Sequence, residues 1–318
     1  MLTRSAVEVV MRASLAEDAP WGDITSELVI PAAATATTTI TSREAGIFAG
    51  EEIIRTGFAT ADPGLEVTLH VCDGDPLTPG TAIATITGPA RPLLSAERSV
   101  LNLVQRMSGI ATLTARYVAE VEKAVAEVER ANNLPAGSIT RTRVTDTRKT
   151  TPGLRALEKH AVTCGGGHNH RFGLSDAVML KDNHLAVLTA DGTSVTHALR
   201  ELRKKLPHTT HIEVEVDRLD QIEDVLAGGV DTIMLDNFAH SDLISGVAVV
   251  DGRAIVEASG GITLETIGRV ASTGVDVISV GALTHSVRAL DLGLDVAVDQ
   301  PLFTSVSSTT ESSCACRE

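Results

Sequence analysis

The fold is decided by residues 212–236, IEVEVDRLDQIEDVLAGGVDTIMLD. Two short runs rich in Val, Ile, Leu and Met, at 212–216 and 232–235, have the length and composition of buried strands. Between them, residues 219–227 repeat apolar side chains at helical spacing. A strand, a helix and a second strand in this order predict two parallel strands with a helix across one face of the sheet.

The same alternation continues on both sides of this segment. We expect further strands near residue 145 and at 177–180, 254–258 and 277–280, with helices at 194–206, 241–250 and 263–272. The strand count of six to eight favours a closed α/β barrel. An open, doubly wound sheet is less suitable because no GxGxxG fingerprint follows a first strand.

Residues before 118 have a different pattern. After a helix that ends near Asp18, we expect antiparallel strands at 35–42, 46–50, 65–71 and 82–87, followed by a long helix with Ser95 as its N-cap. Trp21, the only tryptophan, is expected to anchor packing in the first turn. We therefore predict an N-terminal α+β sandwich domain (1–118), an α/β barrel domain (119–290), and a return segment with a flexible Ser/Thr/Cys tail (291–318).

Composition excludes several classes of function. The 318 residues carry a formal net charge of -14 and only 2% aromatic residues, which argues against nucleic-acid binding. No apolar run reaches the roughly 18–20 residues that cross a membrane, and the first residues lack a signal-peptide core, so a cytoplasmic protein is expected. The four cysteines form no disulfide or metal-site pattern, and Cys164 is expected to be a semi-buried thiol.

Against this acidic background, residues 141–184 are basic. They hold eight Lys and Arg against four Asp and Glu, together with four of the ten histidines. Such a cluster repels itself, and binding an anion would explain it; a solvated basic face is the alternative. Arg binds carboxylate or phosphate through two parallel hydrogen bonds, and Lys supplies a point charge.

Polar residues also lie at the carboxyl ends of the predicted strands, and barrel enzymes place their active sites at these ends. Glu213 and Glu215 lie in one strand, Asp236 ends the next, and residues 259–261 are Ser-Gly-Gly. Glycines at the last two strand ends, up to Gly281, predict a phosphate site beside a helix N-terminus. Glu215 and Asp236 could stabilise an oxocarbenium-like transition state, bind ribose hydroxyls or share a divalent ion.

Three long motifs carry a family resemblance: EDAPWGDIT (17–25), residues 145–184 and VGALTHS (280–286). They closely resemble the quinolinate phosphoribosyltransferases, also called nicotinate-nucleotide pyrophosphorylases. The resemblance implies a type II phosphoribosyltransferase-like barrel with an N-terminal open-sheet domain. It also implies transfer of phosphoribosyl from 5-phosphoribosyl 1-pyrophosphate to quinolinate with Mg2+, giving nicotinate mononucleotide, pyrophosphate and CO2.

The resemblance assigns residues to three parts of the site. Those similar to the quinolinate pocket are Arg98, Arg148, His170, Arg171 and Lys181. Those similar to the phosphoribosyl-donor and metal residues, and implied as catalytic, are Lys149, Glu215 and Asp236, the last two as shared metal ligands. Those similar to the 5′-phosphate end are Ser259, Gly260, Gly261, Gly281 and His285. The family also implies a homodimer, or a hexamer, with Arg98 reaching the neighbouring subunit's site. From the chemistry alone, Arg98 in the first turn of the long helix could bind an anion at the helix N-terminus, or it could equally pair with Glu97.

Three alternatives remain open. The chain could be a related phosphoribosyltransferase that acts on nicotinate, or a molybdenum-operon homologue. A substrate with a single carboxylate would, however, need fewer cations than this sequence supplies. A Schiff-base aldolase could use Lys149 or Lys181 as its nucleophile. A non-catalytic anion-binding module is disfavoured by Glu215 and Asp236. Residues 127–144 are longer than the family's usual link and could alter a loop near the site, and the tail with Cys314 and Cys316 has no family counterpart.

Overall fold

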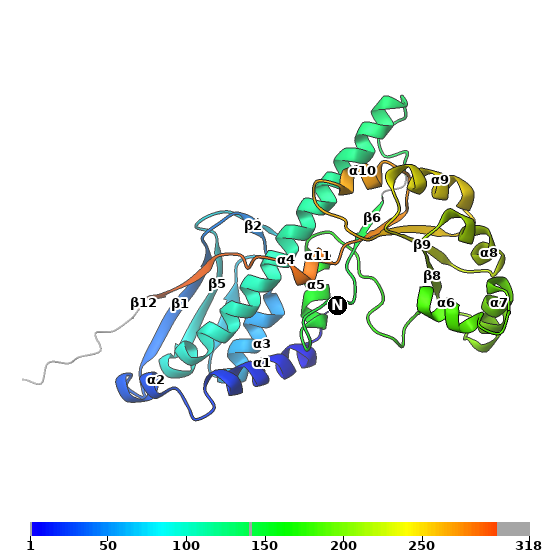
Figure 1. Ribbon diagram of the computed structural model, residues 1–318. Helices are drawn as coiled ribbons and strands as arrows, with labels where there is room; N and C mark the ends of the chain where they lie inside the picture. The colour runs from blue at the N-terminus through cyan, green and yellow to red at the C-terminus, as the bar shows by residue number, and fades with distance from the viewer. Residues whose placement is uncertain (1, 140–141, 298–318) are drawn as a thin grey trace, which may run out of the picture.

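The computed structural model describes residues 2–139 and 142–297. Two parts are joined by one long helix, α4 (Ala90–Ala131) (Figure 1). The elements of the N-terminal part are α1 (Arg4–Asp18), α2 (Ile24–Val29), β1 (Thr35–Ser42), β2 (Gly46–Ile47), α3 (Glu51–Ala61), β3 (Glu66–Leu69), β4 (Pro76–Leu77) and β5 (Ala82–Pro89).

The N-terminal sheet is antiparallel and receives the end of the described chain. Its order is β12-β1-β5-β3, where β12 (Leu292–Ala297) pairs with β1 from Thr37↔Ala297 to Ser42↔Leu292. Alternate residues of β1 are buried, as its pattern of β-branched residues predicts. The expected strands are confirmed with small changes in their bounds, and residues 292–297 of the predicted return segment pair with this sheet. The tail with Cys314 and Cys316 lies outside the described residues.

The long helix begins earlier than we predicted. Its N-cap is Pro89, and Ser95 lies inside the helix, where its hydroxyl donates to the Asp23 carboxylate at 2.8 Å and the Arg91 carbonyl at 3.0 Å. Pro92 is tolerated because the first turn of a helix needs no backbone N–H. The helix continues without a break past residue 118, where we placed a domain division.

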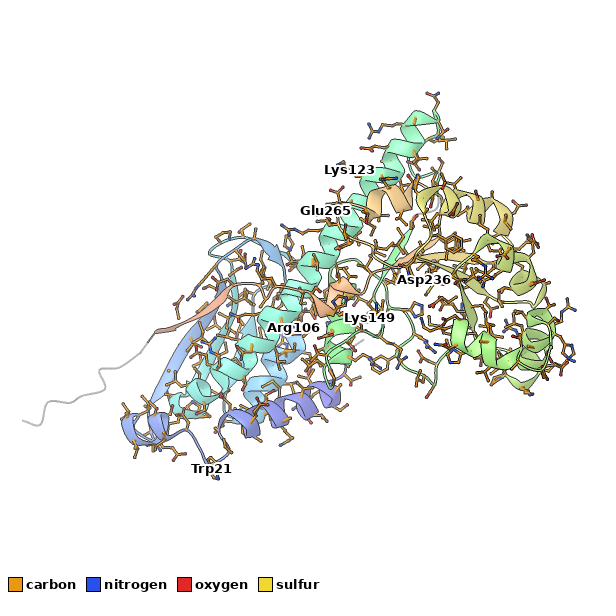
Figure 2. All side chains as sticks on the ribbon, viewed as in Figure 1. Trp21, Arg106, Lys123, Lys149, Asp236 and Glu265 are labelled. Carbon is orange, nitrogen blue, oxygen red and sulfur yellow. The ribbon has the colours of Figure 1, made fainter. Side chains whose placement is uncertain are left out.

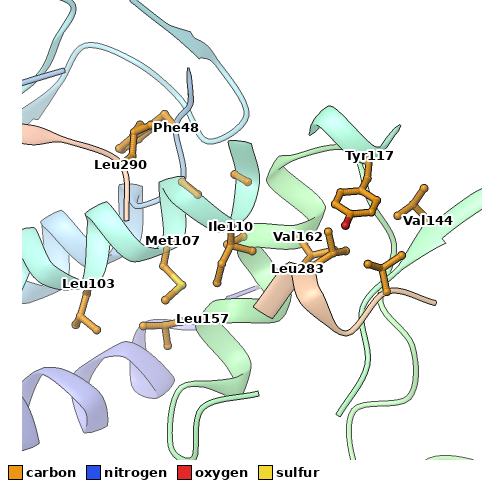
Figure 3. Packing of buried hydrophobic residues seen from close by; sticks show 14 of the residues in the cluster. Phe48, Leu103, Met107, Ile110, Tyr117, Val144, Leu157, Val162, Leu283 and Leu290 are labelled. Carbon is orange, nitrogen blue, oxygen red and sulfur yellow. The ribbon is translucent and has the colours of Figure 1, made fainter. Parts of the chain in front are cut away.

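The core is continuous across the two parts because α4 contributes to both. Met107 and Ile110 of α4 lie between Phe48 and Leu290 on one side and residues of α5 and α11 on the other (Figure 3). These side chains are almost completely buried. The two parts are therefore expected to unfold together.

The second part is a parallel sheet covered by helices. Its six strands run in the order β6-β11-β10-β9-β8-β7, all parallel. Their bounds are β6 (Arg143–Thr145), β7 (Val178–Leu180), β8 (Ile212–Val216), β9 (Thr232–Asp236), β10 (Ile255–Ser259) and β11 (Val277–Ser279). The helices of this part are α5 (Arg155–Cys164), α6 (Asp182–Leu188), α7 (Val195–Lys205), η1 (Leu219–Gln221), α8 (Ile222–Ala227), α9 (His240–Val250), α10 (Ile267–Ala271) and α11 (Ala282–His285).

The α/β class and the lower limit of six strands are confirmed, but closure by hydrogen bonds is not. In the described ranges, β6 and β7 are the two ends of the ladder, and only a single bridge, Thr145↔His168, extends it beyond β6. Helices α3, α5, α6 and α11 were not anticipated.

Two local predictions require correction or comment. Trp21 anchors nothing: it is 95% exposed and projects from the outer edge of the N-terminal part (Figure 2). It precedes Gly22, whose φ of 90° turns the chain into α2, so the side chain is directed away from the core.

In the link at residues 127–144, the Glu129 carboxylate accepts the backbone N–H groups of Gly137 and Ile139 at 3.0 and 2.9 Å. Residues 140–141 of that link lie outside the described residues. In the described ranges, no helix is both long enough and apolar enough to cross a membrane.

Candidate active site

A cavity of about 520 Å³ lies at the carboxyl ends of the parallel strands. All six strands contribute a residue at or just beyond their ends. Its lining residues are Thr147, Arg148, Lys149, His170, Arg171, Met179, Lys181, Glu215, Met234, Asp236, Asn237, Ser259, Gly260, Gly261 and Ser279. Ten of the thirteen residues proposed from the sequence are therefore brought together. Lys149 lies beside α11, and Asp236 lies at the end of β9 (Figure 2).

Two further predicted residues lie just behind Lys149. A side chain at Gly281 would meet the Lys149 stem at 3.0 Å and the His285 ring at 3.1 Å. His285 Nδ1 is 2.6 Å from the Ser286 hydroxyl oxygen. Gly281 therefore lies next to both Lys149 and His285, and neither Gly281 nor His285 lines the cavity.

Arg98 is the one predicted residue that lies apart. Because α4 begins at Ala90, Arg98 is well inside the helix and not at its N-terminus, so the predicted helix-end anion site is wrong. Its side chain is 61% exposed and lies 4.0 Å from the Glu97 carboxylate. Within one chain, Arg98 does not line the cavity.

His170 connects the cavity to the interior of the sheet. Its Nε2 lies 3.0 Å from Glu213 and 3.5 Å from Glu257, both of which are almost fully buried. Sequence reasoning placed Glu213 at a strand end, but it is in the interior of the sheet with its side chain against His170. We did not predict Glu257 because the residues on either side of it are apolar. It lies two residues from both Ile255 and Ser259, so the strand places these three side chains on the same face, and this spacing would have identified Glu257 as facing inward.

This cluster holds protons more tightly than its members do in water. Burial by itself lowers the pKa of His170, but hydrogen bonds and charges from Glu213 and Glu257 outweigh it and raise the pKa to about 10. Burial, followed by the charge of Glu257, raises the pKa of Glu213. His170 Nδ1 accepts the Arg171 backbone N–H at 2.8 Å, so a doubly protonated ring would have to give up that bond.

The strand-like segment that carries His170 is held by a buried ion pair that the sequence did not reveal. Lys159 of α5 pairs with Asp146, and both side chains are almost fully buried. Asp146 accepts the His170 backbone N–H at 2.9 Å, and Lys159 donates to the His170 carbonyl at 2.9 Å. These bonds fix the backbone from which His170 and Arg171 extend.

Arg171 and Arg148 form a cationic wall. Burial, and next the charge of Arg148, lowers the pKa of Arg171. One guanidinium nitrogen of Arg171 donates to the Ala177 carbonyl at 3.0 Å, whereas its buried Nε has no hydrogen-bond partner among the described residues. A bound anion would relieve the repulsion between the two arginines and offer acceptors to their free N–H groups.

Two carboxylates, those of Glu215 and Asp236, line the same cavity and form its carboxylate wall. Glu215 forms an ion pair with Lys181, and the Asn237 amide donates to the Asp236 carboxylate at 2.6 Å. Asn237, which the sequence also placed at this strand end beside Asp236, has a positive φ of 57°. Glu215, Asp236 and Asn237 also line an adjoining cavity of about 680 Å³ on the side of α6 and α8, which gives the site a second compartment.

The Ser-Gly-Gly turn follows β10 directly. Gly260 has a φ of 92°, and a side chain there would overlap the Asn237 amide. The turn does not lead straight into a helix, because α10 begins only at Ile267. The predicted contribution of a helix N-terminus at Gly260 is therefore wrong, whereas α11 does begin directly after the other strand-end glycine, Gly281.

Comparisons with known proteins decide the family. Residues 23–108 match the N-terminal domain of quinolinate phosphoribosyl transferase, and residues 110–295 match its C-terminal domain. The chain belongs to the quinolinate phosphoribosyltransferase family. It is 42% identical to a probable nicotinate-nucleotide pyrophosphorylase [carboxylating] of Bacillus subtilis, over 89% of this chain and 90% of that protein. It is also 42% identical to the enzyme of that name from Mycobacterium leprae, over 92% and 97% of the two chains.

The fold of this family member agrees with a solved structure. NadC from Streptococcus pyogenes superposes with a TM-score of 0.83 at 37% identity, over 94% of this chain and 99% of that one. The family resemblance and the α/β fold class predicted from the sequence are thus confirmed. The match of residues 110–295 to one family domain covers the second half of α4 and the first four residues of β12.

Proposed function

We propose that this chain catalyses transfer of the phosphoribosyl group of 5-phosphoribosyl 1-pyrophosphate to quinolinate, with loss of CO2. The observation that carries the proposal is a single cavity lined both by Arg148 and Arg171 and by Glu215 and Asp236. The family to which the chain belongs supports the same activity.

The cationic wall suits a ring with two carboxylates. Arg148, His170, Arg171 and Lys181 would bind quinolinate, and the free Nε of Arg171 supplies a donor that needs an acceptor. A monocarboxylate such as nicotinate would leave part of this positive charge unpaired in a partly buried site. Quinolinate is therefore favoured over nicotinate.

The donor would occupy the other half of the cavity. Lys149 would contact the pyrophosphate, and Glu215 and Asp236 would face the ribose. The 5′-phosphate would bind the backbone N–H groups of Ser259, Gly260 and Gly261, with Gly281 and His285 behind Lys149. Unhindered backbone N–H groups are suited to close contact with a phosphate.

Mg2+ fits the carboxylate wall. Glu215 and Asp236 come from the adjacent strands β8 and β9 and line both compartments, and carboxylate oxygens are the ligands that this ion prefers. Mg2+ usually binds through one or two carboxylates together with substrate phosphates. The bound ion would neutralise the leaving pyrophosphate, and Lys181 would hold Glu215 in place.

The chemistry needs no protein nucleophile. The pyridine nitrogen attacks C1 of the ribose as the bond to pyrophosphate breaks, and Glu215 and Asp236 stabilise the positive charge that develops on the sugar. The ring nitrogen is cationic once it is bonded to the ribose, so its positive charge stabilises the carbanion left on the adjacent ring carbon when the carboxylate departs as CO2. A proton then replaces CO2 on the ring.

The assembly proposal concerns Arg98. Its exposed side chain lies outside its own cavity, which suits a role in the site of a neighbouring subunit of a homodimer, or of a hexamer built from such dimers. We place the enzyme in the cytoplasm, with its two small-molecule substrates as partners.

The activity is tested with quinolinate labelled in the carboxyl group next to the ring nitrogen. Labelled CO2 should appear only when the phosphoribosyl donor and Mg2+ are present, in equal amounts with nicotinate mononucleotide. Faster turnover of nicotinate than of quinolinate would instead support the nicotinate enzyme. Covalent trapping of a carbonyl substrate at Lys149 or Lys181 by borohydride would support the aldolase.

A further inference from the structure

A second cluster of reactive side chains lies outside the cavity, where α5 meets the turn before β4. Asp73 belongs to that turn, and His160 and Cys164 lie four residues apart on α5. One ligand atom of each residue lies within 4.8 Å of the other two. We propose that Asp73, His160 and Cys164 bind one divalent transition-metal ion, Zn2+ in preference, which joins the N-terminal part to α5.

The geometry favours an ion over a catalytic triad. His160 Nε2 is 2.7 Å from the Asp73 carboxylate and 3.5 Å from the Cys164 sulfur. In a nucleophilic triad the acid and the nucleophile bind different nitrogens of the histidine. Here both converge on Nε2, so all three ligand atoms surround one point.

The spacing is close to that of a tetrahedral zinc site. Usual zinc–ligand distances place nitrogen and oxygen about 3.4 Å apart, and nitrogen and sulfur about 3.6 Å apart. The nitrogen–sulfur distance of 3.5 Å already agrees. Only the Asp73 carboxylate, now hydrogen-bonded to His160 at 2.7 Å, would have to withdraw, by less than about 1 Å. A water would fill the fourth position.

The Asp73 carboxylate is already oriented for this role. Its other oxygen accepts the backbone N–H groups of Gly50 and Glu51 at 2.6 and 3.1 Å, at the start of α3. Asp73 N–H in turn donates to the Glu51 carboxylate at 2.7 Å. Such outer bonds fix the direction of a metal ligand and are part of its affinity.

The local charge also favours a cation. The carboxylates of Asp73 and Glu51 lie near the Cys164 thiol and act on it through their charge. A divalent ion would displace the thiol proton, form the zinc–thiolate bond and offset these carboxylates. The mixed N, S and O ligand set suits Zn2+ much better than Mg2+.

The test uses full-length protein freed of metal with a chelator. Because Cys314 and Cys316 could also bind metal, the protein carries Cys314→Ser and Cys316→Ser. Titration with Co2+ should give a thiolate-to-cobalt charge-transfer band that saturates at one ion per chain, and Zn2+ should abolish it. Zn2+ should also raise Tm, because the site holds two parts of the folded chain together.

Single variants in that background locate the site. Cys164→Ser should remove the charge-transfer band, and His160→Gln should weaken Zn2+ binding at least 10-fold in competition with a chromophoric chelator. Cys72→Ser is the matched control, because this exposed cysteine is next to Asp73 and should leave both readouts unchanged. Circular dichroism checks folding, and the near-isosteric Cys164→Ser keeps the test valid if His160→Gln unfolds.

Two results would overturn the proposal. One is a Co2+ band that persists in Cys164→Ser, which would place the thiolate ligand elsewhere. The other is the absence of any band in the parent protein, whether or not the Cys314 and Cys316 tail is intact.

Discussion

Arg171 lies beside Arg148 on the cationic wall of the cavity, with its Nε buried and unpartnered among the described residues. If quinolinate supplies the missing acceptor, Arg171→Ala should weaken quinolinate binding by about 2–4 kcal/mol, because it removes one member of a desolvated charge pair. This is about 30- to 1,000-fold in Kd. Calorimetric titration of quinolinate measures it.

Arg269 provides the control for this prediction. It is exposed on α10 and does not line the cavity, so Arg269→Ala removes the same charge from another place. Its Kd for quinolinate should match that of the unchanged protein. Equal affinities of Arg171→Ala and Arg269→Ala would rule out the assigned role of Arg171.

The buried cluster of His170, Glu213 and Glu257 predicts how stability depends on pH. The pKa values of His170 and Glu213 are both raised in the folded state, so folding takes up protons. The stabilising contribution of His170 is complete below its unfolded pKa of 6.5 and is lost as the pH rises toward about 10. The free energy of unfolding should therefore fall over this range.

Glu257→Gln removes one of the carboxylates that favour the bound proton. The unchanged protein should lose more stability than this variant between about pH 6.5 and pH 10, by on the order of 2 kcal/mol, in urea unfolding at several pH values. Glu265→Gln, at an exposed position, should behave like the unchanged protein. Parallel pH profiles for all three proteins would contradict a shared proton in the cluster.

At the scale of elements, a glycine in α4 allows another segment of the chain to approach the helix closely. A side chain at Gly109 would overlap the backbone carbonyl of Arg288, in the segment that returns to the N-terminal sheet. Alanine is the better helix former by about 1 kcal/mol, yet Gly109→Ala should destabilise the protein because the close approach is lost. We expect a lower Tm and a net loss of about 1–3 kcal/mol.

Gly268 on α10 is the comparison for Gly109. Its added side chain would meet Ala124 at 3.5 Å, an ordinary contact, so Gly268→Ala should be neutral or slightly stabilising. A stabilising effect of Gly109→Ala would show that the return segment can move away from α4 at little cost.

The sequence predicted the strand–helix alternation and most of the cavity because both depend on local pattern. Strands of five residues such as β8 and β9 have clear composition, and their polar ends identify Glu215 and Asp236. The start of α4 was misplaced because Ser95 resembles an N-cap and Pro92 resembles a break. The pairs of Lys159 with Asp146 and of His170 with Glu257 join residues far apart in the chain, and no local pattern records them.

At the scale of the whole molecule, Arg98 is the residue that a single chain leaves without a role in its own site. If it completes the cavity of a partner subunit, Arg98→Ala and Lys149→Ala should each be almost inactive. Mixing and reassembling the two inactive proteins should restore activity to about a quarter of the original, because half of the random dimers contain one intact site. Mixing without recovery, in dimers shown to exchange subunits, would place Arg98 outside the site.

The most direct test of the cavity is a crystal structure of the protein with quinolinate bound. We expect the two carboxylates to lie within hydrogen-bonding distance of the cationic wall formed by Arg148 and Arg171, with the ring nitrogen directed toward the side of Glu215 and Asp236. Quinolinate bound elsewhere, or Arg148, His170, Arg171 and Lys181 directed apart into solvent, would contradict the account.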